Sequence, residues 1–233
     1  MWSLMKRMLH AAREQLWGLI EWPVSFMPGP LGMRLRSVYW KRRLRAMGKH
    51  VRFGVGVRID GPAWVQIGDE CRIDDYVIIL AGPVVEDGFF VCHKPNPKFT
   101  AKAGEVIIGK QVHIAPYVQL QGHGGLMIGN CLTIAAGAKV YSLSHHYRDL
   151  TGKGDTATIW KFGGSILPEE QALISGPVVI QNGAAVGLNS VVLPGSVIGE
   201  NSWLGAMSTL RGELPPGVIA GGNPAAIIKN RFE

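Results

Sequence analysis

The 233-residue sequence contains little cysteine and little charge. Its three cysteines, Cys71, Cys92 and Cys131, are odd in number and widely separated, and no CxxC pair occurs. Neither a disulfide framework nor a zinc knuckle is therefore indicated, and a reducing, cytosolic setting is favoured. Charged residues make up 18% of the chain and apolar residues 47%, a balance that excludes a disordered protein.

The net charge of +7 is unevenly distributed along the chain. Residues 1–59 contain 12 Lys and Arg but two acidic residues, Glu14 and Glu21, which gives this segment a net charge of +10. Residues 60–233 carry a net charge of −3. The basic character therefore belongs to an N-terminal arm, and no nucleic-acid-binding motif accompanies it. We do not expect a nucleic-acid partner.

The arm, residues 1–50, has the pattern of basic amphipathic helices. Apolar residues at positions 2, 5, 9, 12, 16 and 19 step by threes and fours along one helix face. Two interpretations remain open. The arm contacts the anionic inner face of the cell membrane, as basic, aromatic-rich amphipathic helices do, or it packs on the following domain as an end cap.

Aliphatic residues recur every six positions from residue 180 onward. The run is Ile180, Val186, Val192, Ile198, Leu204 and Leu210, and Ala or Ser stands four places after each of the first five. The same phase appears upstream, from Ile67, Ile108 and Ile128. A period of six fits neither a helix nor an alternating strand. It predicts a solenoid of about five triangular coils with one continuous core, interrupted by insertions near residues 88–106 and 145–177.

This repeat resembles that of the hexapeptide-repeat acyltransferases, in their sugar O-acetyltransferase branch. The resemblance extends over residues 51–229, and its more specific motifs are Val140–Asp149 and the Gly-Asn-Pro-Ala segment that begins at Gly222. It implies an all-β fold, a left-handed parallel β-helix, over residues 51–222. The helical arm precedes this domain, and a tail of residues 223–233 with a short C-terminal helix follows it. The resemblance also implies a homotrimer whose active sites lie between neighbouring chains.

The same resemblance places the catalytic base at His145, where the second insertion begins. A sugar hydroxyl must lose its proton as it attacks a thioester carbonyl, and a neutral imidazole near pH 7 accepts that proton. Backbone N–H groups stabilise the oxyanion that develops on the carbonyl oxygen. The family places this N–H donor in the repeat that begins at Val186, which is Gly187 or Leu188 here.

Residues near His145 in the resemblance are candidates for binding the acceptor. They are His146, Asp149, Gln121 and His123. Asp149 is also a candidate to orient His145, and His146 is an alternative base. The chain departs from the family pattern twice, because residues 119–123 contain no carboxylate and Ala185 stands where the family usually has Trp. Both departures concern recognition of the acceptor.

The last repeats and the tail resemble the acyl-CoA-binding region of the family. Small residues let the pantetheine chain approach the backbone, and cations contact the phosphates. The candidates are Gly205, Ala206, Arg211, Gly222, Asn223, Pro224 and Lys229. Acetyl-CoA is the expected acyl donor, and we expect no metal requirement.

The resemblance therefore predicts an acetyl-CoA-dependent O-acetyltransferase that acts on a sugar hydroxyl in surface polysaccharide or glycan biosynthesis. The expected location is the cytoplasm, or the inner face of the membrane if the arm binds lipid. Two alternatives stay open, an N-acyltransferase acting on an amino-sugar nucleotide and a non-catalytic binding scaffold. A zinc-dependent γ-class carbonic anhydrase is disfavoured, because the His-x4-His pair of that class is missing.

Overall fold

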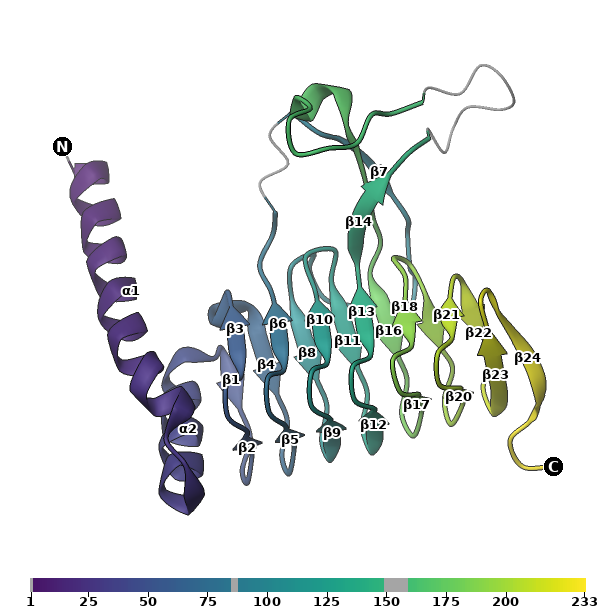
Figure 1. The fold of residues 1–233 in the computed structure, drawn as a ribbon, viewed down its shortest axis with the longest axis horizontal. Coiled ribbons are helices and arrows are strands. Elements are labelled where there is room, and N and C mark those ends of the chain that lie inside the picture. The colour runs from purple at the N-terminus through teal and green to yellow at the C-terminus, as the bar shows by residue number, and fades with distance from the viewer. Residues whose placement is uncertain (1, 85–87, 149–158) are drawn as a thin grey trace.

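The structure is a computed structural model that describes residues 2–84, 88–148 and 159–233. Two N-terminal helices, α1 (Trp2–Phe26) and α2 (Gly29–Arg43), precede a solenoid of short strands. A flap stands out from one side of the solenoid between its two ends (Figure 1).

Three parallel sheets, named faces A, B and C, form the sides of the solenoid. Face A consists of β1 (Ala46–Met47), β4 (Val65–Ile67), β8 (Val106–Ile108), β11 (Leu126–Ile128), β16 (Val178–Ile180), β19 (Val197–Ile198) and β22 (Glu213–Leu214). Face B consists of β2 (Arg52–Phe53), β5 (Arg72–Ile73), β9 (Val112–Ile114), β12 (Leu132–Ile134), β17 (Ala185–Val186), β20 (Trp203–Leu204), β23 (Val218–Gly222) and β24 (Ala225–Asn230). Face C consists of β3 (Arg58–Asp60), β6 (Ile78–Leu80), β10 (Gln119–Gln121), β13 (Lys139–Tyr141), β18 (Val191–Val192) and β21 (Thr209–Leu210).

Within the described ranges these strands make six complete coils and part of a seventh, whereas the repeat predicts about five. The six-residue period is explained by the register between coils. On face B, Ile134 lies beside Ile114 on one side and Val186 on the other, and on face C, Leu120 lies beside Val140. These side chains are at most 1% exposed, and each buried aliphatic group contributes about 1.5–3 kcal/mol to folding. The predicted solenoid with its continuous core is confirmed.

The small residues of the repeat line the inner side of the corners. Ser190 is fully buried, donates a hydrogen bond from Oγ to the carbonyl of Gly205 (2.7 Å) and accepts one from the N–H of Ser208 (3.2 Å). Ser202 does the same with the carbonyl of Pro215 and the N–H of Val218. The serines thus satisfy backbone groups that would otherwise be buried without partners.

Both predicted insertions leave the solenoid at the corner between faces C and A, and they pair with each other. The first contributes β7 (Phe90–His93) and the second contributes β14 (Leu143–His146) and β15 (Ala172–Ser175). Their order is β14-β15-β7, with β14 antiparallel and β7 parallel to β15. This three-stranded sheet is called the flap below. One-turn 3₁₀ helices also occur at Pro62–Trp64 and Pro168–Glu170.

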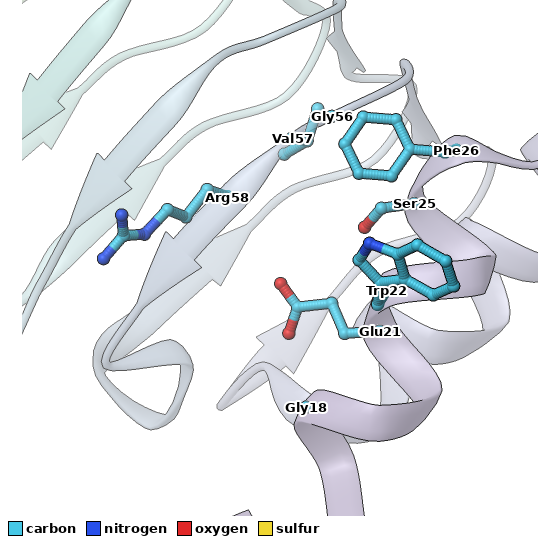
Figure 2. Close-up of a pocket in the computed structure, with 8 residues that line it drawn as sticks. All are labelled: Gly18, Glu21, Trp22, Ser25, Phe26, Gly56, Val57 and Arg58. Carbon is cyan, nitrogen blue, oxygen red and sulfur yellow. The ribbon is translucent and has the colours of Figure 1, made fainter. Parts of the chain in front are cut away.

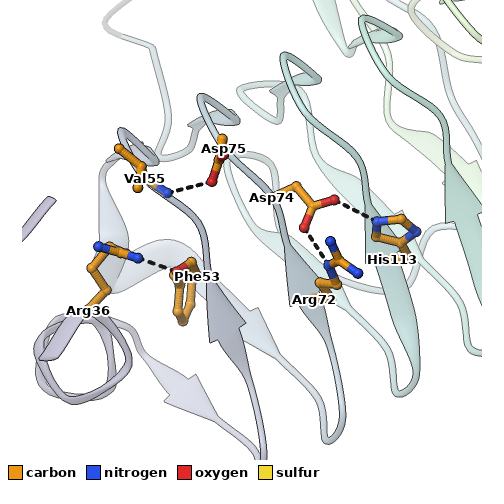
Figure 3. Close-up of polar contacts among 7 residues, drawn as sticks. All are labelled: Arg36, Phe53, Val55, Arg72, Asp74, Asp75 and His113. Atoms are coloured by element: carbon orange, nitrogen blue, oxygen red, sulfur yellow. Dashed lines mark hydrogen bonds and ion pairs between the residues drawn. The ribbon is translucent and has the colours of Figure 1, made fainter. Parts of the chain in front are cut away.

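Helix α2 closes the first coil as an end cap. Trp40 is 1% exposed and packs against Phe53, at 6.1 Å between ring centroids. Arg36 is buried beside them and donates hydrogen bonds from Nε to the carbonyl of Phe53 (2.9 Å) and from Nη1 to that of Met27 (2.7 Å), as Figure 3 shows for the first. Burial lowers the pKa of Arg36, and the nearby Asp75 carboxylate opposes this shift.

Helix α1 extends away from the solenoid (Figure 1). One part of its surface therefore packs on the core, and other parts are exposed. Trp17 and Val24 pack against the core. Large apolar side chains that are 47–75% exposed lie along other sides of the helix, namely Leu16, Leu19, Ile20, Trp22 and Phe26. Among the described residues, no helix is long and apolar enough to cross a membrane.

The expectation of a short C-terminal helix is wrong. Residues Ala225–Asn230 form strand β24, which turns back at Asn223 and Pro224 and pairs antiparallel with β23. The last coil leaves the backbone of β23 available for pairing, and the β-branched pair Ile227 and Ile228 favours an extended strand over a helix.

We predict that replacing Arg36 with leucine lowers the free energy of unfolding by about 2–4 kcal/mol, because the buried carbonyls of Phe53 and Met27 lose their donors. Urea unfolding followed by circular dichroism measures this change. Arg34→Leu, at an exposed position on the same helix, is the matched control and is expected to shift stability by less than about 0.5 kcal/mol. Equal stability of the two variants would contradict the role of Arg36 in holding the cap.

Candidate functional site

Several predicted residues gather at the corner between faces B and C in the last three coils. They are Gly187, Leu188, Gly205, Ala206, Gly222, Asn223 and Pro224. Adjacent coils approach so closely here that a Cβ added to Gly187 would lie 2.4 Å from the amide nitrogen of Ala206. The N–H of Gly222 donates to Ser208 Oγ at 3.0 Å. Gly187 therefore lets adjacent coils stack closely at this corner, where the side chain of Leu188 is 49% exposed.

The two candidate oxyanion donors at this corner differ in availability. The N–H of Gly187 donates to the carbonyl of Leu204 at 2.8 Å, as part of the ladder between coils. The N–H of Leu188 donates no hydrogen bond to the part of the chain that the structure describes. Leu188 precedes Asn189, which has a φ of 53°. Of the two, the amide of Leu188 is the one available to a ligand.

The His145–His146 pair lies on the flap, at the other end of face C. Strand β13 continues through Ser142 into β14, and the side-chain oxygen of Gln121 accepts a hydrogen bond from the N–H of Leu143 at 2.9 Å. Gln121 thus fixes the base of the flap. Because successive residues of a strand point to opposite sides, His145 and His146 face different surroundings.

His145 is exposed and contacts two aromatic rings edge-on. Its ring centroid lies 6.2 Å from that of Phe89 and 4.7 Å from that of Phe162. Asp149, the predicted carboxylate partner of His145, lies outside the described residues. The aromatic contacts fix the plane of the imidazole and leave its edge open to an incoming hydroxyl.

His146 is half-buried and faces two cations. Burial lowers the pKa of His146, and the positive charges of Arg211 and Lys94 lower it further. The imidazole of His146 is therefore neutral near pH 7. Lys94 was not among the predicted residues, because the pairing of β7 with β15 brings it here from about fifty positions upstream of His146. The only feature of the sequence that could have pointed to Lys94 is that a basic residue occurs inside an insertion.

The other predicted residues lie at two separate places on the solenoid, the corner between faces C and A and the outer part of face B. His123 Nδ1 lies 2.8 Å from the carbonyl oxygen of Gly82, near the base of the flap. Arg211 follows β21 at the corner between faces C and A, away from Asn223. Lys229 lies on β24 opposite Ile219, toward the far end of face B. The predicted acyl-CoA residues thus do not form a single cluster in one chain.

A further histidine–carboxylate pair lies on face B. Asp74 accepts hydrogen bonds from Arg72 Nε (2.6 Å) and His113 Nε2 (2.8 Å), as Figure 3 shows. The guanidinium of Arg72 shares this carboxylate, so the group is a surface ion-pair network on adjacent coils. Within the described ranges, no group of three or more His, Cys, Asp or Glu side chains is arranged to hold a metal ion.

Pockets lie at the cap end of the solenoid. One of about 410 Å³ is formed by α1 and the first coil, with Trp22, Phe26 and Glu21 around it (Figure 2). Another, of about 340 Å³, lies beside Arg36 and Asp75. A third, of about 360 Å³, lies on face C and is lined by residues that include Gln121 and Tyr141. None of these three contains both His145 and Leu188.

Comparison with known proteins was made by sequence and by structure. No protein-family model matches the chain. The dTDP-4-amino-4,6-dideoxy-D-glucose acyltransferase of Escherichia coli is 24% identical over 188 residues, which are 80% of this chain and 82% of that protein. WbbJ of E. coli K12, named a lipopolysaccharide biosynthesis O-acetyl transferase, is 30% identical over 126 residues, or 54% of this chain and 61% of that protein. The matched region thus spans less than two thirds of WbbJ.

Comparison with solved structures also finds sugar acyltransferases. A variant of AntD, an N-acyltransferase from Bacillus cereus in complex with dTDP-4-amino-4,6-dideoxyglucose and coenzyme A, superposes with a TM-score of 0.65. It is 25% identical, and the match covers 89% of this chain and 90% of that one. A maltose O-acetyltransferase from Clostridium difficile 630 shares the fold at 16% identity, with a TM-score of 0.55 over 97% of this chain and 89% of that one.

These relatives confirm the resemblance predicted from the six-residue repeat. The protein is an acyltransferase with a left-handed parallel β-helix fold, and it is similar to the hexapeptide-repeat acyltransferases. Its relatives by sequence and by structure include sugar acyltransferases.

We predict that replacing Lys94 with methionine raises the pKa of His146 while leaving it below the ordinary histidine value, because burial is the larger cause of the shift. The pH dependence of the imidazole proton resonances, assigned by comparison with His146→Asn, measures this pKa. In the wild type, the unfolded chain binds a proton at this residue before the folded chain does, so the contribution of His146 to stability falls as the pH drops through the ordinary histidine value. An unchanged titration in Lys94→Met would show that the two groups are not neighbours.

Proposed function

We propose that this protein transfers an acetyl group from acetyl-CoA to a sugar hydroxyl, with His145 as general base. The hydroxyl oxygen attacks the thioester carbonyl carbon while the imidazole takes the hydroxyl proton. The N–H of Leu188 stabilises the oxyanion. Collapse of the tetrahedral intermediate breaks the C–S bond, and the proton passes from His145 to the thiolate. The products are the O-acetyl sugar and coenzyme A.

The observations that carry this proposal are the exposed imidazole of His145, at the mouth of a loop that leaves the solenoid, and the N–H of Leu188, which is free within the described ranges, at the corner between faces B and C. AntD is described as holding coenzyme A and a dTDP-sugar at the same time, which supports the two substrate classes. We place the pantetheine chain of acetyl-CoA along the corner formed by Gly205, Ala206 and Gly222–Pro224. Lys229, at the other end of β24, is the cation of the tail that we assign to the phosphates of acetyl-CoA.

The proposed site requires more than one chain. In one chain, His145 lies beyond the flap end of the face C strands, whereas Leu188 lies at their opposite end. A homotrimer, expected from the resemblance, supplies each site with His145 from one chain and Leu188 from the next. The outer surface of face C carries Ile78, Leu80 and Val191, which are half-buried in the isolated chain, together with the charged residues Arg58, Asp60 and Lys139.

A second candidate is N-acylation of an amino-sugar nucleotide. It is favoured by the dTDP-4-amino-4,6-dideoxy-D-glucose acyltransferase, matched over 80% of this chain, and by AntD. The two reactions give chemically different products, because hydroxylamine cleaves an ester and leaves an amide intact. Incubation with [¹⁴C]acetyl-CoA and a hydroxyl sugar or an amino sugar, followed by hydroxylamine, separates them.

We predict that His145→Ala lowers kcat for acetyl transfer by about 10²–10⁴-fold, the usual contribution of a general base. Release of free thiol from acetyl-CoA in the presence of the sugar acceptor measures this rate. His50→Ala, at an exposed corner of the first coils, is the control and should retain the wild-type rate. Near-normal turnover by His145→Ala would overturn the assignment of the base, and a comparable loss in His146→Ala alone would transfer the role to His146.

The exposed apolar residues of α1 support contact with a membrane surface. Leu16, Leu19 and Ile20 lie on a part of the helix that does not pack on the solenoid. The arm, residues 1–50, carries a net charge of +8, of which α1 contributes +1. A basic segment with an apolar face binds anionic lipid in the plane of the interface. The cap interpretation applies to α2, and the membrane interpretation is proposed for α1. On this basis the enzyme is cytoplasmic and binds the inner face of the membrane peripherally.

We predict that the full chain sediments with vesicles that contain phosphatidylglycerol, and that Leu16→Ser combined with Leu19→Ser weakens this binding at least tenfold. Leu167→Ser, which alters an equally exposed apolar residue near the flap, should bind as the wild type does. If the double variant binds the vesicles as strongly as the wild type, the proposed contact of α1 with the membrane is wrong.

A further inference from the structure

The side chain of Lys94 packs along a corner of the solenoid where two glycines leave room for it. A Cβ added to Gly195 would lie 2.9 Å from Lys94 Cδ, and one added to Gly176 would lie 2.9 Å from Lys94 Cβ. The two glycines therefore leave room for the aliphatic part of the lysine. Burial of this part lowers the pKa of Lys94, and the charge of Arg211 adds to the effect.

The backbone around Lys94 is held firmly. The N–H of Lys94 donates to the carbonyl of Ser175 at 2.7 Å, at the end of the β7–β15 pairing. Two residues further on, Asn96 Nδ2 donates to the carbonyl of Pro177 at 3.0 Å. The ammonium is therefore presented from a fixed segment, so its position costs little conformational entropy.

Arg211 and His146 complete a group of basic side chains between the flap and the last coils, here called the cationic corner. Lys94 packs against Gly195, and the turn that contains Arg211 and Gly212 stacks on the turn at Gly195 and Ser196, where Gly212 N–H donates to Ser196 Oγ at 3.2 Å. His146 lies on β14, which pairs with β15, and β15 also pairs with the strand that ends just before Lys94. Burial lowers the pKa of His146, and the charges of Arg211 and Lys94 lower it further, in agreement with this placement.

Glu213, two residues after Arg211, is ion-paired with Lys98. In residues 2–84, 88–148 and 159–233, no carboxylate forms an ion pair with Lys94 or Arg211. Two cations held together without a counter-ion repel each other and favour an anion between them.

We propose that the cationic corner binds a phosphate group carried by the sugar acceptor. His145 and His146 are consecutive residues of β14, the edge strand of the flap, so the acceptor reaches from the cationic corner around this edge to His145 on the other side. A phosphoryl group held by the ammonium, the guanidinium and the N–H of a neutral imidazole gains charge-assisted hydrogen bonds. Arg211 thereby serves the acceptor, in place of the acyl-CoA role that the sequence resemblance implies for it. The acceptor class is a sugar linked to a phosphate or diphosphate, and this rests on the proposed acyl-transfer function.

Binding of inorganic pyrophosphate to the full chain, measured by calorimetry at low ionic strength, tests the site without requiring turnover. Lys94→Met and Arg211→Met are each expected to weaken binding roughly tenfold. Lys102→Met removes an exposed lysine from the same insertion and should leave binding unchanged. His145→Ala should bind pyrophosphate as the wild type does, because that residue points away from the cationic corner. Equal affinity of wild type and both methionine variants, or no binding by the wild type, would overturn the proposal.

Steady-state kinetics separate a phosphate of the acceptor from those of acetyl-CoA. With dTDP-glucose as acceptor, both methionine variants should raise the acceptor KM about tenfold and leave the acetyl-CoA KM unchanged. A rise confined to the acetyl-CoA KM would assign the cationic corner to the donor and overturn the proposal. If pyrophosphate binding follows the expected pattern while no acyl acceptor gives turnover, the anion site stands and the proposed acetyl transfer fails.

Discussion

Every functional feature of this protein depends on the register in which one coil stacks on the next. Buried aliphatic side chains lie directly over their counterparts, as Ile134 does over Ile114, and buried serines such as Ser190 and Ser202 join the corners of adjacent coils. A shift of a single residue would turn the aliphatic row outward. The register therefore fixes the backbone at each corner, and most candidate site residues lie at these corners or on the insertions that leave from them.

The corners have different uses because the chain interrupts the repeat at one of them. At the corner between faces C and A, two insertions leave the solenoid and pair as the flap, which carries the adjacent histidines His145 and His146. At the corner between faces B and C, the repeat continues without interruption, and glycine-containing turns stack closely on one another. Face C separates the two regions within one chain. This separation is the physical reason why we propose a site shared between chains.

The solenoid was predictable because a six-residue period has one structural explanation, and the insertions were predictable as breaks in that period. The position of His145 followed from the motif around it. Lys94 was not predictable, since its place beside His146 depends on pairing between two insertions far apart in the sequence.

The tail was predicted wrongly for a related reason. Its residues have an apolar pattern that suits either a short helix or a strand, and the open edge of β23 decides in favour of the strand. In the arm, α2 is a cap held by Arg36 and Trp40, and α1 is a projecting helix. The charge pattern of the sequence does not distinguish these two roles.

Complementation between two inactive variants tests the shared site most directly. Leu188→Pro removes the proposed oxyanion N–H, and the turn accepts proline because Pro116 occupies the equivalent position of an earlier coil, directly before Tyr117 with its φ of 62°. We predict that His145→Ala and Leu188→Pro chains are each inactive alone and regain part of the wild-type acetyl transfer when they are unfolded together and refolded as mixed oligomers. Mixed oligomers that stay as inactive as the separate variants would contradict a site formed by His145 of one chain and Leu188 of the next.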